Sequence, residues 1–84
     1  MSITSQVRGY ILENLLFTDD PAALADGESL LDRGVVDSTG VLEIVLFLES
    51  TFGVQVKESQ MLPDNFESVD AIARFVGRLQ EDRA

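Results

Sequence analysis

The chain has 84 residues and a net charge of −9, from fifteen acidic and six basic side chains, and it contains neither cysteine nor histidine. This length corresponds to one small domain, residues 1–84, which no disulfide and no thiolate metal site can hold together. The missing histidine excludes the common zinc and iron sites and every Ser-His or Cys-His catalytic arrangement, and the scarcity of Lys and Arg argues against binding to nucleic acid or to anionic membranes.

The apolar runs of the chain indicate its cellular location. The stretch after Arg8 is interrupted by Glu13 and Asn14, so it does not resemble a signal peptide. No run reaches the roughly 20 apolar residues of a membrane-spanning helix. We therefore expect a cytoplasmic protein without a membrane span. The start at Met1 suggests a protein that stands alone rather than a piece of a larger multidomain chain.

The first expected helix lies near the N-terminus, where Ser2 or Thr4 could cap it. Apolar residues recur along it at helical spacing and predict the face that packs on the core: Ile3, Val7, Tyr10, Ile11 and Leu15.

The connection from Thr18 to Asp37 is long for a compact domain. It carries more apolar side chains than a free linker would: Leu24, Leu30, Leu31, Val35 and Val36. We expect some of them to hold the loop on the core, with a helical turn near Pro21 to Leu24.

The second expected helix runs from about Ser38 to Thr51 and ends at Gly53. Its core stripe follows helical spacing: Val41, Ile44, Val45, Leu48 and Phe52. Leu42 and Leu46 fall beside this stripe. They are either additional core or an exposed apolar strip for binding another protein, and we favour exposure.

Two further helices are expected after Gly53. A short third helix from about Lys57 to Leu62 is stopped by Pro63, and Phe66 then packs inward. Ser68 caps the last helix, whose core stripe is Val69, Ile72, Val76 and Leu79, flanked by Phe75. Amphipathic helices joined in this way predict an all-α, small four-helix up-and-down bundle with a long first loop.

Asp37 and Ser38 lie where the long loop meets the most hydrophobic helix. A helix N-terminus favours an anion such as a phosphate, but Asp and Ser at this place are also ordinary helix caps. Between Gly9 and Val56 the only basic residue is Arg33. The same span holds nine acids: Glu13, Asp19, Asp20, Asp26, Glu28, Asp32, Asp37, Glu43 and Glu49. Such a surface suits a basic partner, or it simply keeps a small protein soluble.

The run from Asp37 to Val45 resembles the Asp-Ser motif of the acyl and peptidyl carrier protein family. Ser29-Leu30 and Gly34 resemble the approach to that motif, and the stretch from Asn65 to Val69 resembles the peptidyl and aminoacyl carriers. The resemblance covers nearly the whole chain. Thr39-Gly40 departs from many fatty-acid carriers, which have a large apolar residue followed by a polar or acidic one.

The resemblance implies a non-catalytic, stand-alone, monomeric carrier domain. A phosphopantetheinyl transferase, using magnesium, would attach 4′-phosphopantetheine from coenzyme A to Ser38, and Asp37 would fix the helix start. An adenylate-forming acyl or amino-acid ligase, or an acyltransferase, would load the thiol of this arm with an acyl or aminoacyl group as a thioester. Partner enzymes would dock on the second helix at Thr39, Leu42, Glu43, Leu46 and Glu49.

Three alternatives stay open. The chain could be an unmodified interaction module in which Ser38 is only a cap, or a fatty-acid synthesis carrier rather than a ligase-loaded aminoacyl carrier such as a D-alanyl carrier. Thr39-Gly40 and the stretch from Asn65 to Val69 favour the aminoacyl carrier. A hydrolase with a serine nucleophile is disfavoured, because the chain has no histidine to act as its base.

Overall fold

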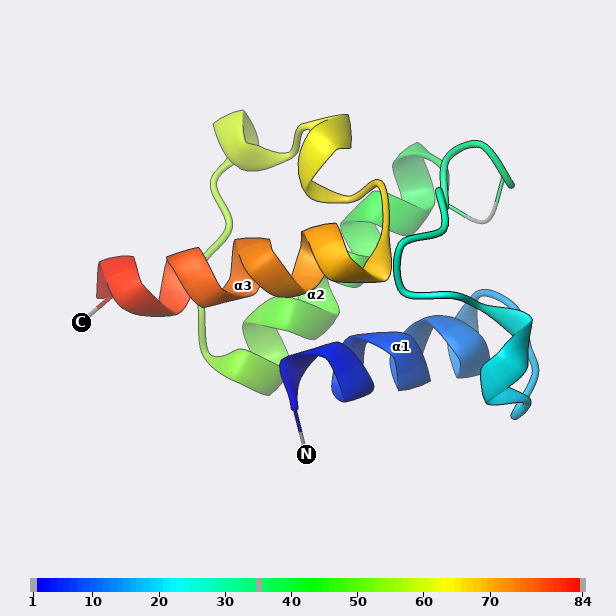
Figure 1. Cartoon of the computed structure of the whole chain (residues 1–84). Helices are drawn as coiled ribbons and strands as arrows, with labels where there is room; N and C mark the ends of the chain where they lie inside the picture. The colour runs from blue at the N-terminus through cyan, green and yellow to red at the C-terminus, as the bar shows by residue number, and fades with distance from the viewer. Residues whose placement is uncertain (1, 35, 84) are drawn as a thin grey trace.

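The fold, taken from a computed structural model, consists of helices joined by loops (Figure 1). The structure describes residues 2–34 and 36–83, apart from the side chains of residues 21, 38, 82 and 83. Within these residues there are three α-helices and no strand: α1 (Ile3–Asn14), α2 (Ser38–Phe52) and α3 (Val69–Arg83). None of these helices is long and apolar enough to cross a membrane.

α1 and α3 lie side by side and run in opposite directions, and α2 crosses behind α3 in the view of Figure 1. The predicted caps form at both outer helices. The N–H of Ser5 donates to the Ser2 hydroxyl oxygen (3.1 Å), and the N–H of Ala71 donates to the buried hydroxyl oxygen of Ser68 (3.0 Å). Each cap satisfies an N–H group that the first helical turn leaves without a partner.

The core is built by the predicted stripes together with residues from the loops. Val7, Ile11, Ile44, Val45 and Leu48 are buried as expected. Phe66 and the whole apolar stripe of α3 are buried with them: Val69, Ile72, Phe75, Val76 and Leu79. The other residues of the predicted stripes are partly buried at its margin: Ile3, Tyr10, Leu15, Val41 and Phe52.

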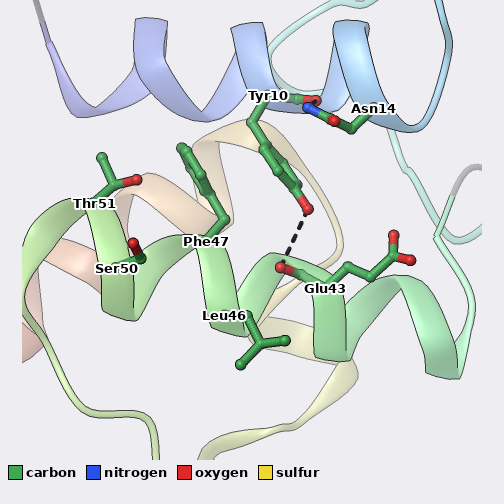
Figure 2. A pocket seen from close by; sticks show the side chains of 7 residues that line it. All are labelled: Tyr10, Asn14, Glu43, Leu46, Phe47, Ser50 and Thr51. Carbon is green, nitrogen blue, oxygen red and sulfur yellow. Dashed lines mark hydrogen bonds between the residues drawn. The ribbon is translucent and has the colours of Figure 1, made fainter.

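An aromatic cluster joins α1 to α2 (Figure 2). The rings of Tyr10 and Phe47 stack with centroids 4.2 Å apart, and Phe52 meets Phe47 edge-on at 6.0 Å. The Tyr10 hydroxyl donates to the backbone carbonyl oxygen of Glu43 (3.3 Å). Such aromatic contacts add stability beyond the burial of their area, so this cluster fixes where α1 lies along α2.

The long loop is held on the core, as predicted, by Leu24, Leu30 and Val36, which are all buried. The predicted helical turn is a 3-10 turn at Pro21–Ala23. Leu31 instead remains 37% exposed. Val35, also proposed as an anchor, lies outside the described residues.

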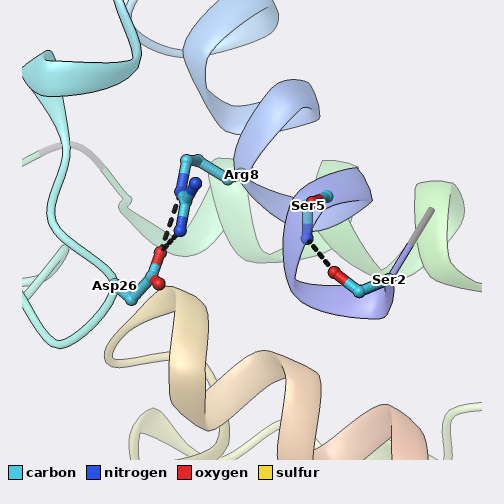
Figure 3. Close-up of polar contacts among 4 residues, drawn as sticks. All are labelled: Ser2, Ser5, Arg8 and Asp26. Carbon is cyan, nitrogen blue, oxygen red and sulfur yellow. Dashed lines mark hydrogen bonds and ion pairs between the residues drawn. The ribbon is translucent and has the colours of Figure 1, made fainter.

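Polar contacts fasten the same loop to both outer helices. The guanidinium of Arg8 on α1 forms an ion pair with the Asp26 carboxylate, with its Nε 2.8 Å from Oδ1 (Figure 3). The N–H of Asp70 donates to the Asp26 carbonyl oxygen (3.0 Å), and the N–H of Leu30 donates to the Glu67 carbonyl oxygen (2.7 Å). The loop that leads to α2 is therefore held in place by contacts to α1, to α3 and to the segment that precedes α3.

The predicted short third helix from Lys57 to Leu62, and with it the count of four helices, is not confirmed. Two single 3-10 turns, Glu58–Gln60 and Pro63–Asn65, occupy this stretch. The proline ring of Pro63 disfavours a helical conformation for the residue before it, and Leu62 is extended (φ −97°, ψ 145°). The few residues left before that point are too short to offset the cost of nucleating an α-helix, and short pieces commonly form 3-10 turns.

Candidate functional site

The N-terminus of α2 is capped by Asp37 and not by Ser38. Asp37 has an extended backbone (φ −117°, ψ −169°), and its Oδ1 accepts a hydrogen bond from the N–H of Gly40 (2.8 Å). Ser38 is consequently the first residue of the helix. The side chain of Ser38, the predicted attachment point, lies outside the described part of the structure.

Gly40 lies directly beneath this cap and is buried. A Cβ atom at this position would contact the Asp37 Oδ1 at 3.4 Å and a methyl group of Val36 at 3.6 Å. These are ordinary van der Waals distances, so the cap and the end of the loop leave room for a methyl group at position 40. Of the pair Thr39-Gly40, which set this chain apart from many fatty-acid carriers, Gly40 donates the cap hydrogen bond and Thr39 is exposed.

Four of the five residues predicted for docking share one exposed face of α2. Thr39, Leu42, Glu43 and Leu46 follow each other at helical spacing, and all are exposed. We call these four residues the α2 face. Leu42 and Leu46 are 53% and 66% exposed, so the expectation that they form an exposed strip is confirmed.

Glu49, the fifth predicted docking residue, lies at the edge of this face and has a structural contact. Its Oε2 accepts a hydrogen bond from the N–H of Val56 (3.0 Å), and the side chain is half-buried. Glu49 therefore fastens the segment that follows α2 back onto the helix. Its role in docking stays a prediction, as do the docking roles of the α2 face.

A groove between α1 and α2 adjoins Glu43 and Leu46 (Figure 2). Tyr10 and Asn14 form its α1 side, and Phe47, Ser50 and Thr51 continue it along α2. Burial, and secondarily the nearby Glu43 carboxylate, raises the pKa of the Tyr10 phenol above its ordinary value of 10.0. The groove therefore borders the α2 face on the side of α1 with polar and aromatic side chains. Of the residues that line the groove on α1, the sequence pattern singled out only Tyr10, and it predicted Tyr10 as a core residue.

A second groove, of about 580 Å³, lies on the other side of Leu42. Asp37 lies in its lining, and the remaining walls are apolar: Leu31, Val41, Leu42, Met61, Leu62 and Pro63. We call it the apolar groove. Sequence reasoning missed the contribution of Met61 and Leu62, which were assigned to a short helix. The sequence feature that could have indicated this groove is the pair of large apolar side chains directly before Pro63, in a stretch that places few side chains in the core.

The cations close to the loop are engaged by its own acids. Arg8 pairs with Asp26, and Arg33 pairs with Glu28 and also donates to the Ala23 carbonyl oxygen (3.0 Å). Asp32, Asp37 and Glu43 are exposed around the start of α2. This end of the molecule therefore presents negative charge beside apolar side chains, which suits a partner that brings Lys or Arg together with apolar groups.

Comparison with known proteins identifies relatives of this chain. No family model matches it. It is 40% identical over 65 residues to the D-alanyl carrier protein of Streptococcus pyogenes serotype M5 (strain Manfredo), a match that covers 77% of this chain and 81% of that protein. The D-alanyl carrier protein of serotype M49 (strain NZ131) matches equally well.

A solved structure is similar in both fold and sequence. It is the Bradyrhizobium japonicum glycine:[carrier protein] ligase complexed with glycylated carrier protein, with a TM-score of 0.60 and 28% identity, covering 86% of this chain and 90% of the matched chain. Together with the identity to the D-alanyl carrier proteins over most of their length, this likeness shows that the chain belongs to the carrier protein family.

Proposed function

We propose that this protein carries a small aminoacyl group as a thioester on a 4′-phosphopantetheine arm attached to the hydroxyl of Ser38. The observation that carries the proposal is the Asp37-Ser38 pair at the start of α2, in a chain 40% identical to D-alanyl carrier proteins. Both similar proteins are named for small amino acids, D-alanine and glycine. This favours an aminoacyl cargo over the fatty-acyl alternative.

The residues around Ser38 fit the proposed group. Residue 38 opens a helix, and the partial positive charge of a helix N-terminus favours the phosphodiester that would form there. Asp37 is already engaged by the N–H of Gly40, so the cap holds the first turn in place without using Ser38. When bound, the arm supplies the thiol that forms the thioester, which this chain cannot supply because it has no cysteine.

Partner enzymes perform the chemistry in this proposal. A serine hydroxyl is a poor nucleophile without a base, and the chain has no histidine. A phosphopantetheinyl transferase with magnesium would therefore activate Ser38, and an adenylate-forming ligase would load the arm. The α2 face, apolar at Leu42 and Leu46 and acidic at Glu43, would dock these enzymes.

Intact-mass measurement tests the proposal. Incubation with coenzyme A, magnesium and a broad-specificity transferase should add one phosphopantetheinyl group to the wild type and none to Ser38→Ala. The substitution should leave unfolding nearly unchanged, because Asp37 makes the cap. A mass that stays unmodified with several transferases would refute the proposal and favour an unmodified interaction module.

A further inference from the structure

We propose that Phe17, just after the end of α1, is an anchor that inserts into an apolar socket of the ligase that loads the arm. This inference rests on the function proposed above and adds a contact that lies on neither the α2 face nor the apolar groove. The side chain is 82% exposed, more than any other large apolar side chain that the structure describes. An aromatic ring held in water in this way contributes no burial to a small core.

The backbone at Phe17 has a conformation that phenylalanine rarely adopts. Its φ of 55° lies in the left-handed region, and it is the only non-glycine residue with a positive φ in the part of the chain that the structure describes. This region is unfavourable for a residue with a Cβ atom, and glycine and asparagine are the usual residues there. Neither backbone preference nor burial accounts for a phenylalanine at this position, and an outlier of this kind points to a function.

Hydrogen bonds on both sides of Phe17 fix this turn. The N–H of Leu16 donates to the Ile11 carbonyl oxygen (3.0 Å), and the N–H of Thr18 donates to the Leu12 carbonyl oxygen (2.8 Å). Leu16 also packs against the core. Because the backbone on either side is tied to α1, the ring is presented to a partner with little loss of backbone freedom on binding.

The end of α1 lies toward the same end of the molecule as the start of α2. In Figure 2, Asn14 lies toward Glu43 and away from Thr51, so α1 and α2 run in opposite directions. Phe17 follows α1 on the side where residue 38 opens α2. A ligase that binds the arm at residue 38 can therefore contact Phe17 as well.

The charge around Phe17 defines the chemistry of its partner. Glu13, Asp19 and Asp20 are exposed within four residues of it, and the sequence has no basic residue from position 9 to position 32. The partner surface that fits is therefore an apolar socket with Lys or Arg at its rim. An aromatic side chain that fills a pocket inside a polar rim commonly carries much of the affinity of an interface.

Substitution at position 17 separates this role from a structural one. Phe17→Gly and Phe17→Asn remove the ring and tolerate a left-handed backbone, so their midpoints of urea unfolding should stay at or above the wild-type value. Phe17→Tyr keeps an aromatic ring and is the matched control. A lower midpoint for both the glycine and the asparagine variant would show that Phe17 stabilises the fold, which overturns the proposal.

The rate of loading measures the contact itself. Each protein is first modified with coenzyme A, magnesium and the transferase, which should act on all variants at the wild-type rate. An extract of the native cells, supplied with ATP and amino acids, then loads the arm, and intact mass follows the loaded fraction with time. Phe17→Gly and Phe17→Asn should load at least about five-fold more slowly than the wild type, and Phe17→Tyr near the wild-type rate.

The outcomes separate the two proposals. A wild type that takes up no phosphopantetheinyl group, or that is modified but never loaded with an amino acid, overturns the proposed function and the anchor with it. Loading of the wild type that is unchanged by loss of the ring overturns the anchor and leaves the carrier function standing. Modification that is slowed as much as loading overturns the assignment of the anchor to the ligase.

Discussion

Truncation of two leucines on α2 separates folding from recognition. Leu48 is fully buried (0% exposed), whereas Leu46 is 66% exposed, although the two lie only two residues apart. Leu46→Ala and Leu48→Ala remove the same atoms from the same helix. Any difference between the two variants therefore comes from the surroundings of each side chain and not from helix propensity.

The expected magnitudes follow from burial. Burying a whole leucine contributes about 1.5–3 kcal/mol, so the buried third of Leu46 corresponds to about 0.5–1 kcal/mol. Truncating a buried leucine costs about 2–5 kcal/mol, because a cavity is left behind. A domain of 84 residues has a total stability of about 4–13 kcal/mol. Leu48→Ala therefore removes a large part of the stability, and Leu46→Ala a small part.

Urea unfolding followed by circular dichroism measures the free energy of unfolding, and the rate of loading by the cognate ligase measures recognition. Leu46→Ala should unfold near the wild type but load at least about five-fold more slowly, the effect of losing a contact worth more than 1 kcal/mol. Leu48→Ala should lose stability first and loading only as the fold is lost. Gln80→Ala, at an exposed position on α3, is the control for both assays. If Leu46→Ala destabilises the protein as much as Leu48→Ala, the assignment of the two faces of α2 is refuted.

Two further predictions concern the start of α2 and its aromatic border. Asp37→Ala should lower the free energy of unfolding by about 0.5–2 kcal/mol, because the hydrogen bond from the Gly40 N–H is lost. Asp37→Asn keeps a side-chain oxygen for the cap and should stay near the wild type in urea unfolding. Equal losses of stability in the two variants would contradict the cap. Tyr10 is the only tyrosine, so phenolate absorbance should show a pKa above 10.0 in the folded protein and an ordinary value in urea. Because the folded pKa is the higher one, this contribution to stability is fully present below pH 10 and is lost as the pH rises through the folded pKa; a folded pKa at or below the unfolded one would contradict the burial.

The helices and their buried faces were predictable because periodicity is a local property of the sequence. Ile44 and Leu48 lie one turn apart and are both buried, and Leu42 and Leu46, beside them, are both exposed. The Asp37-Ser38 pair could be placed at a helix start for the same reason, since caps are recognised within a few residues. The sequence left open which of the two residues is the cap, and the structure assigns it to Asp37.

The parts that sequence reasoning missed depend on contacts between distant segments. Arg8 and Asp26 are 18 positions apart, and no local pattern marks them as partners. The segment after α2 was predicted to be a short helix because of its length and because Pro63 would end it. The proline instead leaves too few residues for an α-helix, and two 3-10 turns form. The apolar groove arises only when this segment meets the long loop, so it could not be read from either stretch alone.

The exposed leucines are informative because the domain is small. Four of them, Leu31, Leu42, Leu46 and Leu62, are more than a third exposed. Burial of one leucine contributes about 1.5–3 kcal/mol, a substantial share of the total stability that a chain of this length reaches. A small domain that exposes several leucines loses the stability that their burial would contribute. Three of the four line the apolar groove beside residue 38, and Leu46 lies on the α2 face next to it. An apolar patch of this kind beside exposed acids is typical of a surface that other proteins cover part of the time. A carrier that meets partner enzymes in turn requires such a surface.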